Sequence, residues 1–132
     1  MSAPGLLFIV NSLETGGAEK HVVTLLNHLD ASRFRLHLAY LKRGEQLLPQ
    51  LRTVQLASIT CCDVARRIDA RALRQLRGII AGGGIDAVVC TNSYSTLYGE
   101  LAVHRCEPAP RLVSVFHTTT LQTRKQKMQM LL

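Results

Sequence analysis

The chain has 132 residues, of which 47% are hydrophobic and 19% charged, and its formal net charge at pH 7 is +7. This composition fits one globular domain and excludes a disordered chain, and no apolar run approaches the roughly 20 residues that cross a bilayer. The positive charge predicts an anionic partner, and aromatic residues at 5% make nucleic acid the least favoured choice beside a phosphorylated substrate or acidic lipid.

The first half of the chain alternates between strand and helix patterns. Residues 5–11 form a short continuous apolar run, which is typical of a strand covered on both faces. A helix is predicted to start near Gly16, because apolar residues then recur at helical spacing: Ala18, Val22, Leu25, Leu26 and Leu29. A second strand is expected at 34–41, and a weaker third strand at about 53–57.

The second half continues the alternation. An amphipathic pattern predicts a helix over 66–81, ended by Gly82, Gly83 and Gly84, which permit a left-handed cap. A buried strand is expected at 85–91, a helix at 95–105 and a last strand at 111–117.

Strands that alternate with helices pair in parallel through right-handed crossovers. The sequence therefore predicts an α/β fold with an open, mostly parallel Rossmann-like sheet, helices on both faces and strand order 3-2-1-4-5. Such sheets bind ligands at the carboxyl ends of the strands, where the strand order reverses. The segments expected there are 11–17, 91–95 and 117–120.

A glycine pair leads from the first strand into the first helix. Neither GxGxxG nor GxxxxGK[ST] occurs, so the two commonest nucleotide motifs are absent. Gly16 and Gly17 would still let a phosphate approach free N–H groups at a helix N-terminus, and the alternative is that they only form a tight turn. Glu19 lies in the first turn, where its carboxylate interacts favourably with the helix dipole with or without a ligand.

Polar side chains follow the last two predicted strands. Asn92 and Ser93 could bind a hydroxyl-rich ligand, or could simply form a left-handed turn and a helix cap. His117 follows an apolar strand, where a histidine is either structural or functional. The four cysteines lack metal-site spacing and are expected to be reduced, and no nucleophile elbow supports hydrolase chemistry.

Basic residues recur in the predicted helix at 66–81. Arg67, Arg71 and Arg74 are expected on one helix face, where they could contact an anionic membrane surface or simply face solvent. Since no secretory signal starts the chain, the expected location is cytoplasmic, with peripheral contact at the inner membrane face as a further hypothesis.

The segment GGAEKHVVTLLNHL at 16–29, directly after a strand, resembles the opening of family 4 glycosyltransferases of the GT-B fold. Residues 85–92 (IDAVVCTN) and 112–117 (LVSVFH) resemble two later strands of the same N-terminal domain. The resemblance covers about residues 5 to 120.

This resemblance implies transfer of a sugar from a nucleotide-sugar donor to an acceptor, with the nucleotide-sugar as substrate and no further cofactor or metal. Gly16 and Gly17 match the loop that faces the donor diphosphate, and His117 matches the histidine that faces the transferred sugar. Asn92, Ser93 and Thr118 are the acceptor-side candidates. A lipid-linked acceptor would suit the basic helix.

The resemblance also divides the chain. Residues 1–120 would form the acceptor-side domain, with 121–132 as a basic tail or the start of a further helix. The donor-binding domain is expected to be absent from this sequence, since Glu100 and Glu107 do not have the spacing of the family's paired glutamates. The chain alone is therefore expected to be inactive, and a donor domain supplied in trans would complete it.

Two other functions are alternatives to the transferase. A noncatalytic basic α/β module for binding or assembly is the alternative. A dinucleotide-dependent oxidoreductase is disfavoured, because no acidic residue ends the second strand, where Tyr40, Leu41 and Lys42 stand.

Overall fold

A five-stranded parallel sheet forms the centre of the computed structural model, which describes residues 3–116. The strands are β1 (Gly5–Val10), β2 (Arg35–Tyr40), β3 (Leu56–Cys61), β4 (Ile85–Thr91) and β5 (Arg111–Val115). Their order is β3-β2-β1-β4-β5, and all four neighbouring pairs are parallel. The predicted α/β class and strand order are confirmed.

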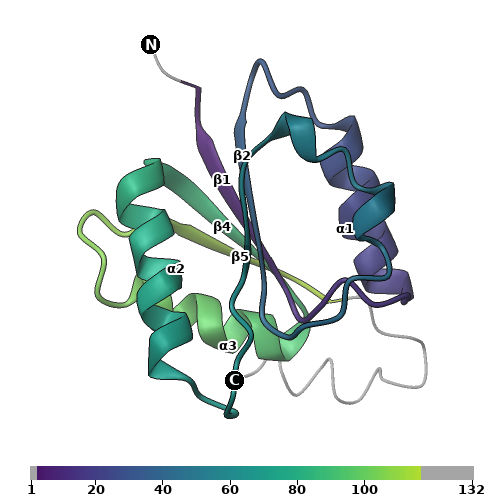
Figure 1. The fold of residues 1–132 in the computed structure, drawn as a ribbon. Helices are drawn as coiled ribbons and strands as arrows, with labels where there is room; N and C mark the ends of the chain where they lie inside the picture. Colours follow the sequence, from purple (N-terminus) through teal and green to yellow (C-terminus); the bar gives the residue numbers. More distant parts are fainter. Residues whose placement is uncertain (1–2, 117–132) are drawn as a thin grey trace.

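Helices cover both faces of this sheet, as predicted (Figure 1). The helix α1 (Gly17–His28) lies on one face, and α2 (Ala70–Gly83) and α3 (Asn92–Val103) lie on the other. Two short 3₁₀ helices, η1 (Leu48–Gln50) and η2 (Thr53–Gln55), connect β2 to β3.

The strand β1 divides the core into two layers, because alternate residues of a strand point to opposite faces. Leu7 and Ile9 are fully buried in the layer beneath α2 and α3. Phe8 and Val10 are buried in the layer beneath α1. A strand buried on both faces needs a continuous apolar run, which is why β1 is easily recognised from the sequence.

The predicted third strand at 53–57 is wrong in its position. Residues Thr53–Gln55 form η2, and β3 runs over Leu56–Cys61. This edge strand alternates between half-buried and exposed residues, so its apolar pattern is weak.

The helix predicted at 66–81 begins later, at Ala70. The carboxylate of Asp69 caps it by accepting the backbone N–H groups of Arg71 at 2.9 Å and Ala72 at 3.4 Å. Arg67 therefore precedes the helix, and the prediction that Arg67, Arg71 and Arg74 share one helix face is wrong.

The helix α2 ends at Gly83 rather than at residue 81, and the predicted left-handed glycine cap is present. Gly84 has φ 58° and ψ 49°, the left-handed conformation that glycine adopts without a steric penalty. The next helix, α3, begins at Asn92 rather than at residue 95. The predicted tail at 121–132 lies outside the described residues.

Candidate functional site

The loops that follow β1 and β2 are joined by backbone hydrogen bonds at the carboxyl edge of the sheet. The N–H of Lys42 donates to the carbonyl of Asn11 at 2.7 Å. The N–H of Leu13 donates to Gly44 at 2.8 Å, and the carbonyl of Leu13 accepts from Leu47 at 2.8 Å. The first loop is therefore held in place before it reaches α1.

The glycine pair lies at the start of α1. Gly16 is the extended N-cap residue, and Gly17 is the first residue of the helix. A Cβ atom on Gly16 would collide with a carboxylate oxygen of Glu19, whereas a Cβ atom on Gly17 would meet nothing within 4 Å. Packing within the described chain therefore does not require glycine at position 17, where a Cβ atom would meet only open space.

The segment between β4 and α3 reaches the same edge. Asn92 has φ 67°, an uncommon conformation for a residue other than glycine. Its carbonyl accepts the hydroxyl of Thr96 at 2.8 Å. The predicted left-handed turn is therefore present, and Ser93 follows it in the first turn of α3.

A side-chain hydrogen bond crosses the point where the strand order reverses. The hydroxyl of Ser95, which is fully buried, donates to the Oδ1 atom of Asn11 at 2.7 Å. The structure thus brings the segments 11–17 and 91–95 together, as the strand order predicted. One signal for this contact is visible in the sequence: polar residues follow each of two neighbouring buried strands, with Asn11 directly after β1 and Ser95 four positions after the end of β4.

The last two predicted site residues, His117 and Thr118, lie outside residues 3–116. Their roles stay predictions.

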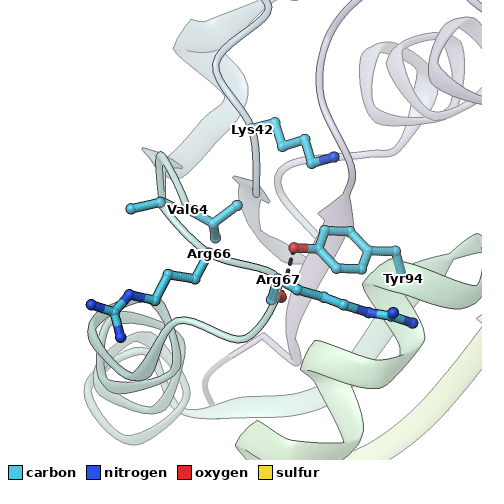
Figure 2. Close-up of a pocket in the computed structure, with 6 residues that line it drawn as sticks. Lys42, Val64, Arg66, Arg67 and Tyr94 are labelled. Atoms are coloured by element: carbon cyan, nitrogen blue, oxygen red, sulfur yellow. Dashed lines mark hydrogen bonds between the residues drawn. The ribbon is translucent and has the colours of Figure 1, made fainter.

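A pocket that sequence reasoning missed lies at the carboxyl edge beside β2 and β3 (Figure 2). It has a volume of about 560 Å³, and its lining residues are Lys42, Val64, Ala65, Arg66, Arg67 and Tyr94. The ammonium of Lys42 lies 5.2 Å from the centre of the Tyr94 ring. Basic residues after two neighbouring strands are the sequence signal that points to this pocket. To use this signal, one must know that β3 ends at Cys61.

The three arginines that are candidates for a membrane surface have different surroundings. Arg67 lines the pocket. The guanidinium of Arg71 donates to the carbonyls of Cys62 at 2.7 Å and Asp63 at 2.9 Å, so it holds the loop after β3. Arg74 is exposed on α2.

The four cysteines are free. Burial raises the pKa of Cys62 to about 11 and that of Cys90 to about 12, so both thiols are protonated at neutral pH. Within residues 3–116, no three His, Cys, Asp or Glu residues gather as a metal site would require. No helix in this part of the chain has the length and apolar character to span a membrane.

The comparisons with known proteins bear on these loops. The family model described as Glycosyltransferase Family 4 matches residues 15–132, beginning immediately before the glycine pair. A search of curated proteins found no match. The matched range includes α1, the pocket and the turn at Asn92, and therefore nearly the whole carboxyl edge.

Proposed function

Because the chain belongs to glycosyltransferase family 4, we propose that it is the acceptor-side domain of an enzyme that transfers a sugar from a nucleotide-sugar donor to a hydroxyl acceptor. In this reaction the bond between the anomeric carbon and the diphosphate breaks, a bond to the acceptor oxygen forms, and the hydroxyl releases its proton. A second domain that binds the nucleotide would complete the site.

The open N-terminus of α1 is the observation that supports a donor site most directly. Its first N–H groups have no partner within the helix, and the helix dipole favours an anion at this end. Gly17 leaves space for a phosphate to approach them. We assign Gly16 and Gly17 to the donor diphosphate, where they would stabilise the negative charge that grows as it departs.

The acceptor side is assigned to the opposite flank of the strand reversal. Asn92 and Ser93 directly follow β4, and His117 and Thr118 follow β5 in the sequence. We propose that His117 faces the transferred sugar and that the other three bind acceptor hydroxyls. Catalysis would then come from positioning and from fixed dipoles, with no covalent nucleophile. The proposed setting is cytoplasmic.

A titration with nucleotide diphosphates and nucleotide-sugars tests this proposal. Backbone amide shifts would be followed with the chain alone and with a candidate donor domain in trans. The expected result is a set of shifts at Gly16 and Gly17 that strengthens when the donor domain is present, together with sugar transfer in the mixture.

The variant Gly17→Ala sharpens this test. A Cβ atom meets nothing within 4 Å at Gly17 or at Gly82, so both substitutions to alanine are tolerated by the fold. We expect Gly17→Ala to weaken nucleotide binding about ten-fold, because the methyl group blocks close approach of the phosphate to the backbone. Gly82→Ala is the matched control and should bind as wild type does.

A noncatalytic binding module is the second candidate. The pocket lined by Lys42, Arg66 and Arg67, here called the cationic pocket, favours it independently. A folded sample that shows no shift at the glycine pair, with or without the donor domain, would contradict the transferase and favour the binding module.

A further inference from the structure

The pocket beside β2 and β3 gathers cations from separate parts of the chain. Lys42 lies two residues beyond β2, and Arg66 and Arg67 lie in the loop between β3 and α2. Tyr94, in the first turn of α3, forms the remaining side. Parallel strands bring these segments to one edge, although Lys42 and Tyr94 are 52 positions apart in the chain.

The backbone that carries the two arginines is fixed. The hydroxyls of Tyr94 and Tyr98 each donate to the carbonyl of Arg67 at 2.8 Å. The carboxylate of Asp69 accepts the N–H of Ala65 at 3.0 Å. These bonds hold the loop as a wall of the pocket before any ligand binds, which lowers the entropic cost of binding.

The positive charges of the pocket are not neutralised by the neighbouring carboxylates. Asp63 pairs with Arg43 at 3.2 Å, and Asp69 pairs with Arg71 at 3.6 Å. Within residues 3–116, the ion pairs are these two, and neither involves Lys42, Arg66 or Arg67. Three cations around one pocket therefore leave a local excess of positive charge.

The side chains indicate which cations would meet a ligand first. Figure 2 shows Lys42 and Arg67 extending toward the side of the loop on which the Tyr94 ring lies, whereas Arg66 extends to the other side. The Tyr94 ring attracts the Lys42 ammonium, which lies 5.2 Å from its centre. Lys42 and Arg67 thus flank a common aromatic surface.

A phosphate group fits this charge and chemistry. A phosphate monoester carries between about −1.5 and −2 charges near neutral pH, and guanidinium and ammonium groups bind its oxygens through strong hydrogen bonds. The volume of about 560 Å³ leaves room for the group that carries the phosphate. Tyr94 of the pocket directly follows the proposed acceptor residues Asn92 and Ser93 in α3. The carbonyl of Asn11, in the first loop, accepts the N–H of Lys42, so the pocket adjoins both the proposed acceptor residues and the donor loop.

From these observations, we infer that Lys42 and Arg67 bind a phosphate carried by the acceptor, with Arg66 at the rim. That the phosphate belongs to the acceptor rests on the proposed function, but phosphate binding at this site can be tested without sugar transfer. The acceptor is then a phosphate-bearing alcohol, either a soluble sugar or polyol phosphate or a phospholipid headgroup.

The test is an amide-shift titration of the full chain with glycerol 3-phosphate, with glycerol as the uncharged comparison. We expect shifts centred on Lys42, Arg67 and Tyr94 with the phosphate alone. Lys42→Gln and Arg67→Gln should each weaken binding about ten-fold, because each removes a charge-assisted hydrogen bond. Arg74→Gln removes the same charge from an exposed helix position outside the pocket, and it should change binding less than about two-fold.

Vesicles of phosphatidylcholine with and without phosphatidic acid form the second arm. Vesicle binding that is lost in Lys42→Gln and Arg67→Gln identifies a lipid phosphate as the source, and soluble binding without vesicle binding identifies a soluble acceptor.

Three results would overturn the inference. The first is no shift at the pocket with millimolar glycerol 3-phosphate. The second is equally weakened binding of glycerol 3-phosphate in Arg74→Gln, which would mean that the effect comes from net charge alone. The third is displacement of glycerol 3-phosphate by a nucleotide diphosphate, which would assign the pocket to the donor. Shifts at Gly16 and Gly17 with the nucleotide are read separately, so the phosphate site and the transferase proposal can fail independently.

Discussion

The Glu19 side chain occupies the position beside Gly16 that a Cβ atom would need. Its carboxylate thus lies close to the N-terminus of α1, where the helix dipole stabilises a negative charge. A donor diphosphate would compete with this negative charge. The residue therefore stabilises the free helix and opposes the proposed ligand.

Glu19→Gln separates these two effects. We expect the neutral side chain to tighten binding of a nucleotide diphosphate about three-fold, and to lower the free energy of unfolding by about 0.5 kcal/mol. Calorimetric titration and chemical denaturation measure the two quantities. Weaker nucleotide binding in this variant would mean that Glu19 contacts the ligand favourably, contrary to the prediction.

His37 is a second residue with a defined electrostatic effect. It is buried in β2, and one ring nitrogen, Nδ1, lies 2.7 Å from the hydroxyl of Ser58. Burial, with a smaller contribution from Arg35, lowers the pKa of His37 below its usual value of 6.5. The unfolded chain therefore binds this proton more readily than the folded chain does.

The free energy of unfolding should consequently fall as the pH drops below about 6.5 and His37 becomes protonated in the unfolded chain. His37→Gln retains a polar group near Ser58 and removes the titration. Its unfolding free energy, measured in urea at several pH values between 5 and 7, should change less with pH than that of the wild type. Identical slopes would assign the pH dependence to other groups.

At the scale of an element, the end of α2 offers a matched pair of glycines. Gly84 has a left-handed backbone, whereas Gly82 lies within the helix with open space around it. Gly84→Ala should destabilise the chain by about 1 kcal/mol through backbone strain, and Gly82→Ala should stabilise it by about 0.5 kcal/mol. Thermal unfolding measures both. A similar loss in the two variants would indicate a general intolerance of this helix to alanine.

The elements that could be predicted from the sequence are those with a strong local signal. The strands β1, β2 and β4 lie in the sheet interior; β1 is a continuous apolar run, and β2 and β4 are mostly apolar. The edge strand β3 was predicted three residues early, because its half-exposed residues give a weak pattern. The start of α2 was also predicted early, since nothing in its helical periodicity shows that Asp69 would cap it.

These two errors explain why the cationic pocket was missed. With β3 ending at 57 and a helix starting at 66, Arg66 and Arg67 become part of a helix rather than of a loop at the sheet edge. The glycine pair and Asn92 were found because each directly follows a well-predicted strand. Tertiary contacts such as the two tyrosine hydroxyls on the Arg67 carbonyl have no local signal at all.

At the scale of the whole molecule, the two faces of the sheet are covered unequally. α3 packs against β4 and β5 on one face, where Leu112 joins the core. The side chain of Val113, the next residue of β5, points to the opposite face and is 44% exposed. An apolar edge strand with an open face favours association between chains.

We expect self-association of this chain at high concentration, and Val113→Lys should reduce it, because a charged side chain on an edge strand opposes pairing. Sedimentation velocity over a range of concentrations measures the effect. Val54→Lys is the control, since Val54 is 92% exposed but lies in η2 rather than in the sheet. An equal effect of both variants would point to net charge instead of this face.

The backbone hydrogen bonds that join the loops after β1 and β2 have a consequence for the kinetics of ligand binding. A loop fixed by Leu13, Gly44 and Leu47 has already lost its conformational freedom when the chain folds. Little further ordering then accompanies the arrival of a diphosphate, so its association should follow simple second-order kinetics without a slow isomerisation step. The remaining barrier is removal of water from the phosphate and from the N–H groups that receive it.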